Sequence, residues 1–200
     1  MKYLLLSISL LLLVACNEQS RINHPSESLQ KNQTLWKKAN IQNYRFVAKR
    51  FCFCPQEEKR LVSVLNGTIA ESKFIPSNTP TQDITKTKKV EDYFAVIRDA
   101  LDKNAHSITV TYNITYGFPE KISIDYDKRM ADEEMSYTIT KFNETLTDGT
   151  IACTQEYMPV CGKVDIRCVM QPCKPMEQTF SNKCMLHANP NATYLRDGEC

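Results

Sequence analysis

The chain has 200 residues and is nearly neutral, with 25 Lys or Arg residues against 23 Asp or Glu residues and a formal net charge of +2. No basic stripe is evident, so a nucleic acid is not expected as a partner. Nine cysteines are present, and this number indicates disulfide bonds in an exported protein rather than a cytosolic metal site. The length suffices for one ordinary domain and a small second one.

The N-terminus has the pattern of an export signal. Lys2 precedes an apolar run over residues 4–14. The run is too short to span a bilayer, which needs about 20 residues, but it has the length of a signal-peptide core. It ends in Leu-Val-Ala before Cys16, and this quartet resembles the lipobox of bacterial lipoproteins. The alternative is an ordinary secreted protein in which Cys16 is one more half-cystine.

The lipobox resemblance implies where the mature chain begins and how it is held. Residues 1–15 would be removed as a signal peptide, and Cys16 would carry lipid that anchors the chain to a membrane of the bacterial cell envelope. Asn17, where an Asp would imply retention at the inner membrane, implies the outer membrane. Residues 16–34 are polar and contain Pro25 but no aromatic residue, so they are predicted to form a flexible tether.

Residues 35–143 are predicted to form a domain of the α+β class, an antiparallel sheet with one amphipathic helix. Apolar side chains recur at helical spacing over residues 90–103, and a short helical lead-in is expected over residues 36–41. Asn66-Gly67 between two apolar runs predicts a β-hairpin. Aromatic, β-branched or alternating patterns predict strands over residues 44–51, 61–65, 68–74, 107–115, 121–126 and 135–142.

Several motifs in this middle part keep a distinctive spacing, among them Tyr44-Arg45-Phe46, Cys52-Phe53-Cys54-Pro55 and Tyr116-Gly117-Phe118-Pro119. Together they resemble an uncharacterised bacterial family of small exported domains, and the resemblance implies no catalytic residue. Cys52 and Cys54 are expected to lie in disulfide linkage, with a redox pair or a soft-metal site as alternatives. A cluster of carboxylates is interpreted as a solvated turn rather than a weak calcium site; its members are Asp125, Asp127, Asp132, Glu133 and Glu134.

The C-terminal part, residues 150–200, carries the most specific pattern. Cys153 and Cys161 bracket the seven residues Thr-Gln-Glu-Tyr-Met-Pro-Val and are followed by Gly162. An Asn-Lys-Cys run ends at Cys184, and Asp-Gly-Glu precedes Cys200. These features resemble the Kazal-type serine protease inhibitors. The resemblance implies a small disulfide-rich module that follows the α+β domain and binds a serine protease through an exposed loop.

The same resemblance implies a disulfide framework for the module. Cys153 would pair with Cys184, and Cys161 with Cys200. The first and fifth half-cystines of a typical Kazal domain have no counterpart here. Cys168 and Cys173 lie in a segment that is longer than in the family, and they are expected to pair with each other and to rigidify an extended hairpin.

The resemblance also implies roles for the loop residues. Gln155 would be the primary specificity residue, and the bond facing a protease would join Gln155 to Glu156, between Thr154 and Tyr157. Asn182 would support the loop by hydrogen bonds to the carbonyls on either side of that bond. A loop held extended in this way loses little conformational entropy on binding.

Two functional classes follow from these residues. The first, which we expect, is inhibition of a serine protease at the cell envelope. The second is a binding or structural module that keeps only the Kazal scaffold, because Gln155 is neither the basic residue that suits trypsin-like pockets nor the large apolar one that suits chymotrypsin-like pockets. An enzyme is not expected, since the three histidines are scattered and no nucleophile-elbow sequence is present. No cofactor and no metal ion are expected.

Overall fold

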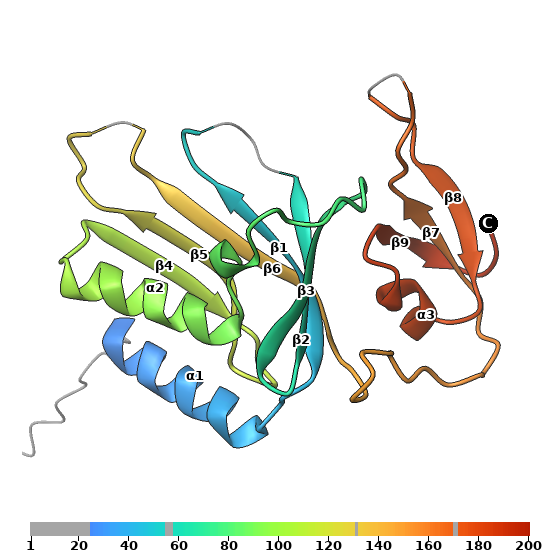
Figure 1. Ribbon diagram of the computed structural model, residues 1–200, viewed down its shortest axis with the longest axis horizontal. Helices are drawn as coiled ribbons and strands as arrows, with labels where there is room; N and C mark the ends of the chain where they lie inside the picture. Colours follow the sequence, from blue (N-terminus) through green and yellow to red (C-terminus); the bar gives the residue numbers. More distant parts are fainter. Residues whose placement is uncertain (1–24, 55–57, 131, 170–171) are drawn as a thin grey trace, which may run out of the picture.

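The computed structural model describes residues 25–54, 58–130, 132–169 and 172–200. The predicted signal peptide and the lipidation site Cys16 lie outside the described residues. Within the described ranges the chain forms a large sheet with two helices and a smaller three-stranded sheet with one helix (Figure 1). No helix in that part of the chain is long and apolar enough to cross a membrane.

The large sheet is antiparallel and six-stranded, in the order β3-β2-β1-β6-β5-β4. A helix followed by three strands occurs twice along the chain, and α1 and α2 lie on the same face of the sheet (Figure 1). The elements are α1 (Pro25–Ala39), β1 (Tyr44–Phe51), β2 (Lys59–Leu65), β3 (Thr68–Ile75), the 3-10 turn η1 (Ile84–Lys86), α2 (Val90–Asp102), β4 (Ser107–Tyr112), β5 (Pro119–Asp125) and β6 (Met135–Glu144).

The main core lies between the two helices and the sheet. The apolar stripe of α2 supplies Phe94 and Ile97, which are 1% and 0% exposed, and β1 supplies Tyr44 and Phe46. Burying each such side chain stabilises the fold by about 1.5–3 kcal/mol. Glu91 at the start of α2 accepts hydrogen bonds from the Trp36 indole at 2.8 Å and from the Tyr44 hydroxyl at 3.2 Å, so it joins both helices to the sheet.

The prediction of a flexible tether over residues 16–34 is wrong from Pro25 onward, where the helix α1 begins. Residues 25–34 therefore belong to a helix that packs on the domain rather than to a flexible spacer. Pro suits the first turn because its missing N–H would have no partner inside the helix. Leu29 and Trp36, seven residues apart, are the buried residues of this helix. Two apolar contacts in a polar sequence give almost no periodic signal, because most of the helix surface faces solvent.

The α+β class and the antiparallel sheet were predicted correctly, and the observed elements differ mainly at their ends. The amphipathic helix predicted over residues 90–103 corresponds to α2, and the short helical lead-in predicted over residues 36–41 is the end of the longer helix α1. The strand predicted to continue to residue 115 stops at Tyr112, because the Asn113 side chain accepts hydrogen bonds from the backbone N–H groups of Thr115 and Tyr116 and forms a turn.

The C-terminal part folds around its own small sheet, in the order β8-β7-β9. Its core consists of Val160, Phe180, Leu186 and Ala192. Gly162 lies against this core, where an added Cβ would come within 2.8 Å of Phe180 and Leu186 atoms, so this position has room only for glycine. The elements are β7 (Val160–Val164), β8 (Met176–Phe180), α3 (Lys183–Ala188) and β9 (Ala192–Asp197).

Candidate functional site

The candidate site is the segment between Cys153 and β7, which forms neither helix nor strand. Its residues from Thr154 to Met158 are exposed, and Tyr157 and Met158 are 64% and 62% exposed. Gln155 is the second residue of this exposed run, and the Kazal resemblance implies an exposed side chain at this position. An exposed segment of this kind keeps one conformation only if other parts of the fold hold it.

Asn182 holds the tip of the loop. Its side-chain Nδ2 donates hydrogen bonds to the carbonyl oxygens of Thr154 at 2.9 Å and of Glu156 at 3.0 Å. These carbonyls lie on either side of Gln155, so the structure has both bonds that the sequence resemblance implies. Asn182 is 7% exposed, and its Oδ1 accepts from the backbone N–H of Met185 at 2.9 Å as the N-cap of α3.

Disulfide bonds close both ends of the loop. Cys153 is bonded to Cys184 on α3, and Cys161 on β7 is bonded to Cys200 at the C-terminus. These are the pairs that the resemblance implies. The remaining described bridges join Cys168 to Cys173 in the segment between β7 and β8, and Cys52 to Cys54 after β1. The last pair is therefore a disulfide here rather than a soft-metal site.

The second half of the loop is tied by contacts that the sequence analysis did not predict. The Tyr157 hydroxyl donates a hydrogen bond to Glu199 Oε1 at 2.6 Å, and this carboxylate raises the pKa of the tyrosine. The backbone N–H of Met158 donates to Ser181 O, and that of Gly198 donates to Pro159 O, each at 2.8 Å. No local pattern marks Glu199 as a loop contact, because it lies 42 residues from Tyr157.

The geometry presents a rigid loop rather than a reaction centre. The backbone on both sides of Gln155 is fixed by a buried amide and by disulfides, while the side chains of Gln155 and Glu156 face solvent. A preorganised, exposed segment is suited to insertion into a cleft of another protein, since few torsions remain to be ordered on binding.

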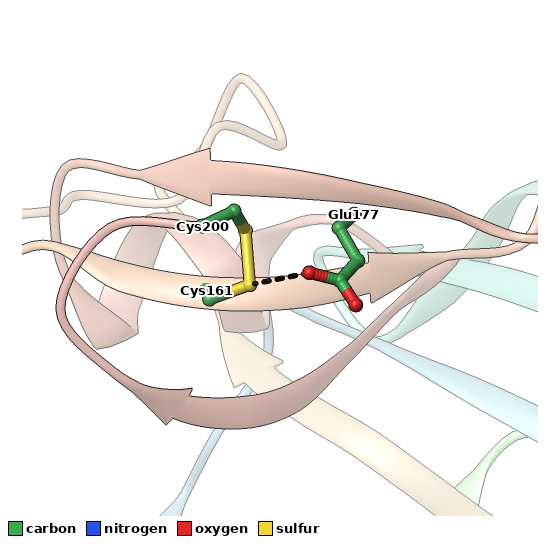
Figure 2. Close-up of side chains that lie close together, drawn as sticks. All are labelled: Cys161, Glu177 and Cys200. Atoms are coloured by element: carbon green, nitrogen blue, oxygen red, sulfur yellow. Dashed lines mark hydrogen bonds between the residues drawn. A yellow bond between two sulfur atoms is a disulfide. The ribbon is translucent and has the colours of Figure 1, made fainter.

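One group of side chains in the described part of the chain has spacing suitable for a metal ion, and Figure 2 shows why it does not form a metal centre. The group contains Cys161, Glu177 and Cys200. The two sulfur atoms are bonded to each other, so neither is the thiolate that a metal ion needs. The Glu177 carboxylate lies 3.7 Å from the Cys161 sulfur and 3.5 Å from the Arg196 guanidinium.

The acidic cluster after β5 is arranged as a turn. Asp127 forms an ion pair with Arg129 at 2.8 Å, and the hydrogen bonds from Arg129 lower the pKa of the Asp127 carboxyl. Glu133 accepts a hydrogen bond from the backbone N–H of Asp127. These carboxylates are engaged by groups of their own turn, consistent with the solvated-turn interpretation.

Comparison with known proteins identifies the larger domain. The family described as a family of unknown function (DUF6174) matches residues 28–144, which run from α1 to the end of β6. The chain belongs to this family. The DUF6174 region covers the helices and the six-stranded sheet and ends before the candidate loop. Neither a curated protein nor a solved structure matches the chain.

Proposed function

We propose that residues 150–200 form a Kazal-like module that inhibits serine proteases through the loop Thr154–Tyr157. The observation that carries this proposal is the pair of hydrogen bonds from Asn182 to the carbonyls of Thr154 and Glu156. In this proposal the protease binds the loop as a substrate, with Gln155 in its primary pocket. Cleavage of the Gln155–Glu156 bond would be unproductive, because Asn182 and the disulfides keep the two new ends together for religation.

We propose further that the chain is a lipoprotein of the bacterial cell envelope, held in the outer membrane by lipid on Cys16. The supporting observation is the Leu-Val-Ala-Cys quartet at the end of the apolar run. Mass spectrometry of the mature N-terminus tests this part. We expect Cys16 as the first residue, with a diacylglyceryl group on its sulfur and an acyl group on its amino terminus, and loss of both cleavage and lipid in Cys16→Ala. An unmodified Cys16, or cleavage elsewhere, contradicts it.

The inhibition proposal is tested by changing the specificity residue. The chain without its lipid anchor is assayed against trypsin, chymotrypsin, elastase and subtilisin, as wild type and as Gln155→Arg, Gln155→Leu and Gln155→Asp. We expect Gln155→Arg to gain trypsin inhibition and Gln155→Leu to gain chymotrypsin inhibition, each by at least 100-fold, and Gln155→Asp to inhibit none. All four should melt at nearly the same temperature, since exposed positions change stability by less than about 0.5 kcal/mol.

The alternative function is a non-inhibitory binding or structural module that keeps only the scaffold. It is favoured by Gln155, whose neutral polar side chain suits neither a trypsin-like nor a chymotrypsin-like pocket. Rapid cleavage of the Gln155–Glu156 bond in every variant, without inhibition, would contradict the inhibition proposal and support the non-inhibitory module.

A further inference from the structure

The DUF6174 domain has a cavity of about 250 Å³ at one end of its large sheet. The residues around it come from segments that are far apart in sequence: the neighbouring strands β1 and β2, the segment from η1 to α2, the first turn of α2, and β6. They are Ala48, Lys49, Arg50, Glu58, Arg60, Val62, Lys86, Thr87, Lys88, Tyr93 and Tyr137.

Positive charge is concentrated around this cavity. On the helix-covered face, its described lining includes four cationic side chains and one carboxylate, although the whole chain has 25 cationic and 23 acidic residues. Lys49 also borders the cavity, but it alternates with Ala48 and Arg50 along β1, so its side chain lies on the opposite face, with its Nζ 4.4 Å from the centre of the Phe51 ring. The carboxylate is Glu58, which accepts a hydrogen bond from the Ser77 hydroxyl at 2.7 Å. A concave surface lined by one sign of charge concentrates the electrostatic potential and attracts ions of the opposite sign. The four cations on the helix-covered face are Arg50, Arg60, Lys86 and Lys88.

The Lys-Thr-Lys segment at residues 86–88 is fixed to the domain. Thr87 is 6% exposed, and its hydroxyl donates a hydrogen bond to Ser72 Oγ at 3.1 Å. The Ser72 hydroxyl in turn lies 2.8 Å from Thr81 Oγ1, and the Thr87 N–H donates to Ile84 O at 3.0 Å. Because Thr87 is buried in this hydroxyl network, the backbone that carries Lys86 and Lys88 has a fixed position beside the cavity before any ligand arrives. The Lys86 ammonium forms an exposed ion pair with Asp83 at 3.3 Å, so Lys88 is the lysine of this segment that the binding test uses.

Two tyrosines and an arginine complete the cavity. Tyr93 and Tyr137 are 4% and 7% exposed. Burial raises the pKa of Tyr93, so its hydroxyl stays protonated at neutral pH and can act as a donor. The Arg60 guanidinium lies 5.1 Å from the centre of the Phe74 ring, which supports its planar group at the edge of the cavity. The Tyr137 hydroxyl lies 2.6 Å from the Met135 sulfur, so Tyr93 is the phenol that can donate to a ligand, and the wall combines cations with this donor.

We propose that this cavity binds a phosphate monoester group. A doubly charged, multi-oxygen anion matches several cations and the Tyr93 hydroxyl better than a single carboxylate does, and guanidinium groups bind such oxyanions in a bidentate manner. The cavity is slightly smaller than the roughly 300–1,000 Å³ of typical ligand pockets, so it accommodates a small molecule or a headgroup. The same chemistry occurs in a soluble phosphate ester and in an anionic phospholipid headgroup.

Two probes distinguish these sources. Glycerol 3-phosphate is titrated into the unlipidated chain by calorimetry at low salt, with glycerol as the neutral control. Separately, the chain is mixed with phosphatidylcholine vesicles with and without phosphatidic acid, and co-sedimentation is measured. Arg60→Gln and Lys88→Gln test the cavity, and Lys121→Gln on β5, an exposed lysine outside the cavity, is the matched control.

We expect Arg60→Gln and Lys88→Gln each to weaken binding at least tenfold, and Lys121→Gln to change it less than twofold. Variant-sensitive binding of glycerol 3-phosphate supports a soluble ligand, and variant-sensitive binding to phosphatidic acid vesicles alone supports a headgroup. Equal weakening by all three substitutions, or no binding to either probe, overturns the proposal. Lys88→Gln keeps the test valid if Arg60→Gln does not fold.

Discussion

Arg45 on β1 donates a hydrogen bond to the carbonyl oxygen of Ala188, the last residue of α3. Asn143 on β6, the register partner of Arg45, adds a bond from its Nδ2 to His187 O at 3.5 Å. The last carbonyls of a helix have no partner inside it, so these two side chains satisfy groups that the short α3 leaves open. Asn182 at the other end of α3 holds the candidate loop. The DUF6174 domain and the loop are thus connected through one helix.

Replacing Arg45 tests this connection. We expect Arg45→Ala to reduce hydrogen-exchange protection of the α3 amides by about 1.5–3 kcal/mol, the usual value of a hydrogen bond to a charged group, and to leave the α2 amides unchanged. Arg98→Ala is the control, because Arg98 also makes a side-chain hydrogen bond, to Gln33 at 2.7 Å, but on the exposed surface of the helices. Unchanged protection of α3 in Arg45→Ala would show that the DUF6174 domain does not stabilise the helix that holds the candidate loop.

We expect the contact between α3 and the large sheet to depend on pH through the side chain of His187. Partial burial, followed by the nearby charges of Lys141 and Lys183, lowers its pKa from the ordinary 6.5. The unfolded chain therefore takes up a proton more readily than the folded one. The free energy of unfolding therefore has its full value above pH 6.5, the ordinary pKa of histidine. It decreases as the pH falls from 6.5 through the lower pKa that His187 has in the folded chain. We expect protection of α3 to decrease over this interval, and His187→Gln to reduce the slope. An identical slope in His187→Gln would assign the effect to other groups.

The strands and α2 could be predicted because each has a regular pattern of its own. Residues 44–51 were predicted as a strand from aromatic and β-branched content and correspond to β1. The helix α2 followed from apolar spacing, which reflects the burial of Phe94 and Ile97. In contrast, α1 buries only two side chains, and its polar sequence is also that of a disordered segment.

The candidate loop could be located because its cysteines and Asn182 lie in recognisable short motifs. The phosphate cavity could not, because its cations come from two strands, from η1 and from the residues that follow it, and no local pattern brings them together. The Lys-rich run near residue 86 lies between the patterns that predict a strand over residues 68–74 and a helix over residues 90–103. Its significance depends on the burial of Thr87 against Ser72, a contact across 15 residues.

The disulfides are expected to differ in their contribution to stability. Cys153–Cys184 and Cys161–Cys200 close segments of 31 and 39 residues, whereas Cys52–Cys54 spans two. Loop-closure entropy predicts a loss of about 3–4 kcal/mol for Ser replacement of either long pair and about 1–2 kcal/mol for the short pair. Urea unfolding of the paired Ser variants measures this. A larger loss from the short pair would indicate that the chain beside β1 depends on it for packing.

Asn182 has two functions in the structure, and two substitutions separate them. Its Oδ1 caps α3 at Met185, and its Nδ2 holds the carbonyls of Thr154 and Glu156. Asn182→Asp keeps an acceptor for the cap but removes the donor and places a carboxylate against two carbonyl oxygens. Asn182→Ala removes both, including a cap that contributes about 1 kcal/mol. We therefore expect both variants to loosen the loop and only Asn182→Ala to fray the first turn of α3.

Limited proteolysis with subtilisin, followed by mass spectrometry, measures cleavage of the Gln155–Glu156 bond, and hydrogen exchange at Met185 reports the cap. Loss of two hydrogen bonds at about 0.5–1.5 kcal/mol each corresponds to about 5- to 150-fold faster opening of the loop. Cleavage should therefore accelerate at least fivefold in both variants, while exchange at Met185 accelerates only in Asn182→Ala. Wild-type cleavage rates in Asn182→Asp would mean that the disulfides and the contacts of Tyr157, Met158 and Pro159 fix the loop without Asn182, and the support that Asn182 gives to the inhibition proposal would be lost.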